Sequence, residues 1–265
     1  MNAKFLASLV FSVGLAATQA ASISVNFRIG NNDNNSVDAG ESATQFESVD
    51  GANWNNITIA AFGNTSNTNN FNNTSLVNNS GDAAATLNTT IRNGGGTGYA
   101  NYGFTSEPNQ GSTGEAGLMH SYLNFGGTQT GETITVNNLA SEFTSKGYKV
   151  YIFHDLNQDR NYGFNINDGS VSQSFWTQDS TTDADANDDG IMEWVRATGT
   201  TSGTATANGN YSLYTGFSGS SFTITGLSSE ARATINGFQI VAVPEPSSTA
   251  LLGLSGLALL LLRRR

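Results

Sequence analysis

Short runs of alternating apolar and polar residues, separated by turn-forming residues, constrain the fold of this chain more than any other feature. Residues 23–27, 133–136, 222–225 and 235–241 follow this pattern. A period of two places successive side chains on opposite faces of a strand, so each run predicts a strand with one buried face. Residues 149–154 form the most apolar run, and we expect them to be a central strand buried on both faces.

Further strands are predicted along the body, together with one helix. The strands are residues 57–62, 84–91, 122–125, 162–166, 172–176, 193–197 and 211–214. The helix is residues 138–146, in which Leu139 and Phe143 lie four apart and Gly147 stops the pattern. Residues 64–79 and 92–98 are rich in Asn, Ser, Thr or Gly and are predicted to be loops. Many short strands with one short helix predict an all-β sandwich or jelly roll in a single domain.

The composition excludes several classes of protein. Cysteine is absent, so disulfide frameworks and thiolate metal sites are excluded. The formal net charge is −10 with only 11 Lys and Arg, and a nucleic-acid partner is not expected because phosphate binding needs clustered basic side chains. The 32 Asn and 30 Gly residues suit a chain with many polar turns.

The amino-terminal segment, residues 1–20, has the three parts of a secretory signal. Lys4 supplies the positive charge, and residues 5–17 form an uncharged, mostly apolar run. Thr18 and Ala20 place small residues at the positions that signal peptidase reads, which predicts a cut between Ala20 and Ala21. The chain is therefore expected to be exported.

The carboxyl-terminal segment, residues 244–265, also has three parts. An apolar run at 250–262 follows a short Ser/Thr spacer, and it is shorter than the roughly 20 residues of a stable membrane span. Terminal arginines stay on the cytoplasmic side of a membrane. We expect a short transmembrane helix that holds the chain in the cytoplasmic membrane transiently. The residues that define the segment are Pro244, Glu245, Pro246, Arg263, Arg264 and Arg265.

This ending resembles the PEP-CTERM sorting signal, in which Pro-Glu-Pro, an apolar helix and an arginine cluster follow in that order. The resemblance implies recognition by an exosortase, processing near Pro-Glu-Pro, and delivery to the cell surface or the extracellular matrix. An ordinary tail anchor is the alternative, and it would keep Arg265 in the mature protein. The body, residues 21–243, resembles the carbohydrate-binding-like sandwich domains that precede such signals, through its strings at 26–27, 53–56 and 237–240.

An acidic stretch after residue 178 resembles the first half of an EF-hand calcium loop. Calcium takes six to eight oxygen ligands, and alternate loop positions supply them. Position 12 is Arg196 rather than Glu, so the match is incomplete, and a solvated acidic loop is the alternative interpretation. The candidate calcium ligands are Asp185, Asn187, Asp189, the carbonyl oxygen of Ile191, and Glu193.

Catalytic motifs are not evident, and we expect no enzymatic activity. His120 and His154 lie outside zinc-helix and nucleophile-elbow motifs, and His154 reads as a structural or surface histidine. Residues 165–169 predict a hairpin turn. Trp176, which polar residues follow, is the tryptophan predicted to be exposed and able to contact a sugar.

These observations together predict an exported surface or matrix protein with a structural or adhesive role. Its expected partners are exosortase, the cytoplasmic membrane and extracellular polysaccharide. The alternatives are a lectin-like carbohydrate-binding module and an extracellular carbohydrate-active enzyme. An enzyme of that kind would show a cleft with two convergent carboxyl groups.

Overall fold

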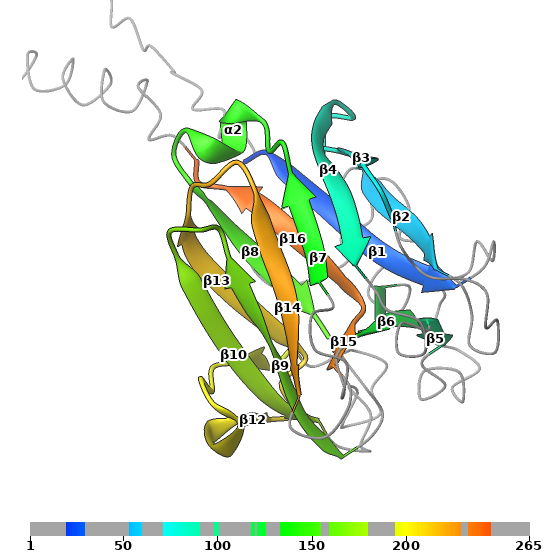
Figure 1. The fold of residues 1–265 in the computed structure, drawn as a ribbon, viewed down its shortest axis with the longest axis vertical. Helices are drawn as coiled ribbons and strands as arrows, with labels where there is room; N and C mark the ends of the chain where they lie inside the picture. Colours follow the sequence, from blue (N-terminus) through cyan, green and yellow to red (C-terminus); the bar gives the residue numbers. More distant parts are fainter. Residues whose placement is uncertain are drawn as a thin grey trace, which may run out of the picture. The chain divides into compact units, whose positions relative to one another are not determined.

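Strands dominate the part of the chain that the computed structural model describes, which is residues 20–29, 53–59, 71–90, 98–100, 118–119, 121–125, 133–154, 159–179, 194–228 and 233–244. They form a six-stranded, a seven-stranded and a three-stranded sheet. The body from Ala20 to Val243 is one compact unit. Figure 1 shows the two large sheets as layers, with β14, β7 and β4 crossing over β8, β16 and β1.

The six-stranded sheet contains both the first and the last strand of the body. Its order is β11 (Arg196–Ala197), β13 (Tyr211–Phe217), β8 (Tyr148–Phe153), β16 (Gly237–Ala242), β1 (Ser22–Ile29) and β2 (Trp54–Ile59). The four inner strands pair antiparallel, whereas β2 joins β1 and β11 joins β13 in parallel. Because β8 has a neighbour on each side and five of its six residues are buried, the predicted central strand is confirmed.

The seven-stranded sheet covers one face of the six-stranded sheet. Its order is β12 (Thr206–Ala207), β10 (Ser172–Asp179), β9 (Arg160–Asn167), β14 (Phe222–Ser228), β7 (Thr133–Asn137), β4 (Ala83–Thr90) and β3 (Thr74–Val77). The three-stranded sheet consists of β15 (Ala233–Ile235), β6 (Ser121–Phe125) and β5 (Gly98–Ala100). The all-β sandwich prediction is therefore confirmed for the described residues.

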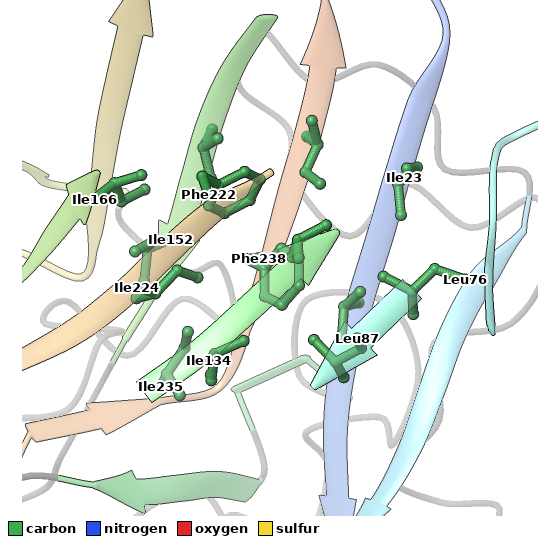
Figure 2. Packing of buried hydrophobic residues seen from close by; sticks show 14 of the residues in the cluster. Ile23, Leu76, Leu87, Ile134, Ile152, Ile166, Phe222, Ile224, Ile235 and Phe238 are labelled. Atoms are coloured by element: carbon green, nitrogen blue, oxygen red, sulfur yellow. The ribbon is translucent and has the colours of Figure 1, made fainter. Parts of the chain in front are cut away.

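The core lies between the two large sheets, and the alternating residues of each strand fill it (Figure 2). Ile23, Val25 and Phe27 on β1 are all completely buried. The Tyr148 ring lies 5.8 Å from the rings of both Phe217 and Phe222, which closes one end of the core. Burial of a large apolar side chain contributes about 1.5–3 kcal/mol, so this core stabilises a domain that has no disulfides.

The other face of the six-stranded sheet carries a second apolar cluster. It joins Trp54 of β2, Tyr151 and Phe153 of β8, Leu213 of β13 and Val241 of β16. Among the described residues outside these strands, the two-residue segment 118–119 and Trp194 also pack in this cluster. This second cluster explains why β8 reads as a continuous apolar run, because both of its faces are covered.

An asparagine side chain joins the edges of the two large sheets. The Asn55 amide group on β2 donates to the backbone oxygens of Ser24 and Val77, at 2.9 Å each. The Asn55 amide oxygen accepts from the backbone N–H of Val77, also at 2.9 Å. The side chain thus pairs with β3 much as a strand backbone would, and it occupies donors and acceptors that an edge strand otherwise leaves open.

Several element boundaries differ from the predictions. The segment predicted as a loop at 64–79 contains β3, because pairing with β4 buries Leu76, the strand's innermost apolar side chain. The helix is only α2 (Ser141–Thr144), since Asn138 has a positive φ of 55° and Ala140 is extended. The last predicted strand is divided into β15 and β16. Of the predicted strand at 193–197, the structure describes residues 194–197, and among these only the two residues of β11 are in a strand.

The predicted signal helix and the predicted carboxyl-terminal transmembrane helix lie outside the described residues. Within the described ranges, no helix is long and apolar enough to cross a membrane.

Candidate functional site

The two ends of the body lie beside each other on neighbouring strands. Ser22, one residue after Ala21, pairs with Val241 on β16. The backbone N–H of Ala242 donates to the Ala21 oxygen at 2.9 Å. The backbone N–H of Val243 donates to the Gly147 oxygen, also at 2.9 Å. The predicted signal-peptidase site and the start of the predicted sorting signal therefore flank the same end of the sheet.

No spacer separates the fold from the predicted sorting signal. Ala242 is still in β16 and only 5% exposed, whereas Val243 is 45% exposed and Pro244 is exposed as well. Among the described residues, Val243 is the one exposed large apolar side chain. Of the six predicted sorting residues, only Pro244 is described by the structure. Processing that leaves the body intact must cut after Ala242, because an earlier cut would shorten an internal strand.

The outer side of the seven-stranded sheet forms a second candidate site, which we call the polar face. Two rows of hydroxyl and amide side chains cross five neighbouring strands, from β4 through β7, β14 and β9 to β10. The register places these residues opposite one another in two rows: Asn88, Thr135, Thr223, Asn167 and Ser172, and Thr90, Thr133, Thr225, Asn165 and Ser174. All ten are half-buried or exposed, and none is charged.

Hydrogen bonds within the polar face hold part of it in place. The Asn165 amide donates to the hydroxyl groups of Ser172, at 3.0 Å, and Ser174, at 2.9 Å. The Asn88 amide oxygen accepts from the backbone N–H of Asn73 at 2.8 Å. Each hydroxyl group can donate one hydrogen bond and accept two, so capacity for a ligand remains.

Trp176 borders the polar face on β10 and is half-buried. It pairs with Gly163 on β9, and Gly163 pairs in turn with Leu227 on β14. A Cβ added at Gly163 would lie 2.1 Å from the Phe175 oxygen, so β9 bears no side chain opposite the tryptophan. Of the other tryptophans, Trp54 is only 9% exposed and belongs to the second apolar cluster. Gly163 itself is buried, so the sheet beside Trp176 is covered and not open to solvent.

His154 lies in the core and not at the surface. Its Nε2 atom is 2.9 Å from the Ser212 hydroxyl oxygen, and both residues are at most 1% exposed. The ring contacts Tyr162 edge-on, with a centroid separation of 5.6 Å. Burial lowers the pKa of His154 to about 3, which keeps the imidazole neutral.

The Ser212–His154 pair lacks what a nucleophile and its base require. A catalytic pair needs access to substrate and an acid that orients the second imidazole nitrogen. The Nδ1 atom of His154 is buried and has no hydrogen-bond partner among the described residues. Within the described ranges, the pair therefore has a structural role in the core, where the Ser212 hydroxyl group hydrogen-bonds to the neutral imidazole.

The predicted hairpin at 165–169 is confirmed. The Asp168 carboxylate links its turn to a second turn, an arrangement that we call the Asp168 junction. One carboxylate oxygen of Asp168 accepts from the backbone N–H groups of Ser170 and Val171, at 2.9 and 2.7 Å. The other accepts from Ser218 and Gly219, at 3.1 Å each. Desolvation raises the pKa of Asp168, but the four N–H bonds outweigh it, and the pKa lies below its usual value.

The candidate calcium ligands, residues 185–193, lie outside the described residues, as do His120 and the sorting residues after Pro244. Where the structure describes the chain, no group of three or more acidic or histidine side chains is arranged to hold a metal ion. Calcium binding therefore stays a prediction of the acidic sequence.

Titration with Ca²⁺ tests that prediction directly. If the acidic segment binds the ion, calorimetry will show heat, and the melting temperature will rise with the logarithm of the Ca²⁺ concentration above the dissociation constant. Asp189→Asn should weaken both signals, because it removes a charged oxygen ligand. Equal melting curves in Ca²⁺ and in chelator, without heat, would show that the segment is only a solvated loop.

The sequence identified the sorting segment and singled out Trp176, whose contact with a sugar stays a prediction, but it did not indicate the polar face or the Asp168 junction. The signal for the polar face was present in the polar half of each alternating run, such as Thr133-x-Thr135 and Thr223-x-Thr225. What the sequence could not supply was the order of the strands, which brings these pairs into register.

Comparisons with known proteins support the sorting segment. Residues 242–265 match the model of the PEP-CTERM protein-sorting motif. The chain therefore carries an exosortase sorting signal, and the prediction from Pro-Glu-Pro, the apolar run and the arginines is confirmed. No curated protein matches the chain.

One similar solved structure is the exo-beta-1,3-galactanase from Phanerochaete chrysosporium, crystallised with galactose. The two are 15% identical, and the superposition has a TM-score of 0.27 over 57% of this chain. The match spans 30% of the galactanase chain. A similarity at this level carries no argument about activity.

Proposed function

We propose that this protein is displayed at the cell surface or in the extracellular matrix, where its β-sandwich has a structural and adhesive role. The observation that carries the proposal is the sorting motif at 242–265, which begins on the last strand of the folded body. Exosortase is the processing partner that the motif implies. Contact with the cytoplasmic membrane is transient in this proposal, because the apolar run is short.

The structure of the body supports a passive role of this kind. Its core is extensive, and side-chain hydrogen bonds such as those of Asn55 join the sheet edges. A displayed protein without disulfides gains from closed edges, because open edges recruit strands from other chains. The predicted cut after Ala20 lies before β1 and the Pro-Glu-Pro segment lies after β16, so neither processing step would remove a strand residue.

Deletion of residues 244–265 tests the sorting step. The truncated protein keeps every strand of the body, so we expect it to fold and to be exported but not to reach the surface or the matrix. Fractionation of cells that carry exosortase, with mass spectrometry of the mature protein, measures destination and processing together. The intact protein should lose its terminal arginines.

A matched control replaces only Arg263, Arg264 and Arg265 with Gln, which removes the cytoplasmic charge and leaves the Pro-Glu-Pro segment in place. It should slow processing without unfolding the body. If the deleted chain reaches the same compartment as the intact chain, with the same mature mass, the sorting proposal is wrong.

A further inference from the structure

The polar face has a chemistry that restricts what can bind it. Its two rows offer hydroxyl and amide groups, which both donate and accept hydrogen bonds. None of the ten residues is charged, although the chain has 21 acidic and 11 basic residues. An ionic ligand would find no counter-charge on this face, and a neutral ligand rich in hydroxyl groups would find matching partners.

The spacing of the rows suits an extended ligand. Neighbouring strands in a sheet lie about 4.8 Å apart, so each row repeats a hydrogen-bonding group at that interval. Thr135 and Thr223 lie on adjacent strands at the centre of one row, with their hydroxyl oxygens 3.5 Å apart. A polymer with regularly repeating hydroxyl groups can contact several strands of one row at once.

Trp176 supplies the apolar contact that the rows lack. Its ring lies on the same face of β10 as Ser174, two residues before it, because alternate residues of a strand share a face. Gly163, opposite Trp176 on the adjacent strand, has no side chain and is itself buried. A half-buried ring next to hydroxyl rows offers a surface on which the apolar face of a sugar can stack.

We propose that the polar face, with Trp176 at its border, binds a neutral polysaccharide. The proposal rests on the proposed surface or matrix location, where such polymers are the expected neighbours, and it names the adhesive partner. The ligand is inferred to be neutral because the ten residues of the face carry no charge. It is inferred to be a polymer because the hydroxyl and amide groups repeat across five strands. A second copy of the polar face is the competing occupant.

Retention of the full chain, purified in mild detergent, on insoluble polysaccharides tests the proposal. The probes are cellulose, insoluble β-1,3-glucan and insoluble α-glucan as neutral polymers, and alginate coupled covalently to agarose beads, without calcium, as an anionic polymer. We expect retention on at least one neutral polymer and none on alginate. Trp176→Ala should lower that retention about tenfold, a loss typical of a central aromatic contact, and Trp176→Phe should restore part of it.

The double variant Thr135→Val and Thr223→Val removes two hydroxyl groups and keeps the shape of both strand positions. We expect it to weaken retention about fivefold, since each lost hydrogen bond lowers affinity modestly. The matched control is Thr215→Val, an exposed threonine on β13 of the other sheet, which should bind as the intact chain does. Equal melting temperatures identify the variants that are properly folded.

Three results would overturn the proposal. These are no retention on any neutral polymer, retention on alginate alone, and equal retention of Trp176→Ala and the double variant with the intact chain. A concentration-dependent dimer in sedimentation that the double variant abolishes would assign the face to self-association instead. None of these affects the cell-fractionation result, so a failure here leaves the proposed location standing.

Discussion

Acidification from pH 7 to pH 4 is expected to destabilise the body strongly through His154. The imidazole has a pKa of about 3 in the folded chain and about 6.5 in the unfolded chain. The unfolded state therefore binds one more proton between these values, and stability falls as the pH falls. The loss is about 1.4 kcal/mol for each pH unit in this window, or roughly 3.5 kcal/mol between pH 6.5 and pH 4.

Thermal melting of the intact chain and of His154→Gln, followed from pH 7.5 to pH 4, measures this effect. The amide of Gln can still meet the Ser212 hydroxyl group but does not titrate, so the variant should lose most of the slope of melting temperature against pH. The matched control is Ser212→Ala, which removes the partner hydroxyl and keeps the titrating ring. A flat melting temperature for the intact chain over this range would contradict the prediction.

Asp168→Ala is the second large effect we expect, with a loss of roughly 2–3 kcal/mol in the free energy of unfolding. The substitution leaves four backbone N–H groups without their carboxylate, and it disconnects the turn after β9 from the turn after β13. Because the site is partly exposed, water can hydrogen-bond to the freed N–H groups, which limits the loss of stability. Denaturant unfolding of the variant beside the intact chain measures it.

Asp82→Ala is a suitable control for Asp168, because Asp82 also lies in a turn and its carboxylate makes no side-chain hydrogen bond with another described residue. The pH dependence separates Asp168 from His154. Because the folded pKa of Asp168 is lowered, its contribution is complete above the unfolded value of 3.8 and is lost as the pH falls through the folded pKa. Equal stability of Asp168→Ala and the intact chain at pH 7 would show that the carboxylate does not hold the turns.

The existence of most strands could be predicted from the sequence because alternation is a local property. Residues 149–154 read as a central strand, and β8 has that position. β3 was missed because Leu76 is the one buried residue among its four, so the strand has no alternating apolar pattern. Its place in the sheet comes from pairing with β4. The parallel partners β2, β11 and β12 depend on contacts between distant segments, which no local pattern encodes.

The candidate sites also differ in how far the sequence could predict them. The sorting segment is contiguous, and its three parts could be recognised directly. The polar face depends on the order of five strands that are not consecutive in the chain. Asn55 illustrates the same limit: a turn-forming residue in the sequence becomes, through its contacts with Ser24 and Val77, the link between two sheets.

The position of β16 between β8 and β1 means that the six-stranded sheet can finish folding only when the last strand of the body is present. The Gln239 amide donates to the Ser24 hydroxyl from 215 residues away, so the last strand closes a sheet that the first strand began. Contacts this distant in sequence slow folding, and a sheet that lacks an internal strand exposes two unpaired edges. An exported chain would carry these edges until residues 237–242 emerge, with the sorting segment directly behind them. The body would thus become fully folded while the chain is still held at the membrane.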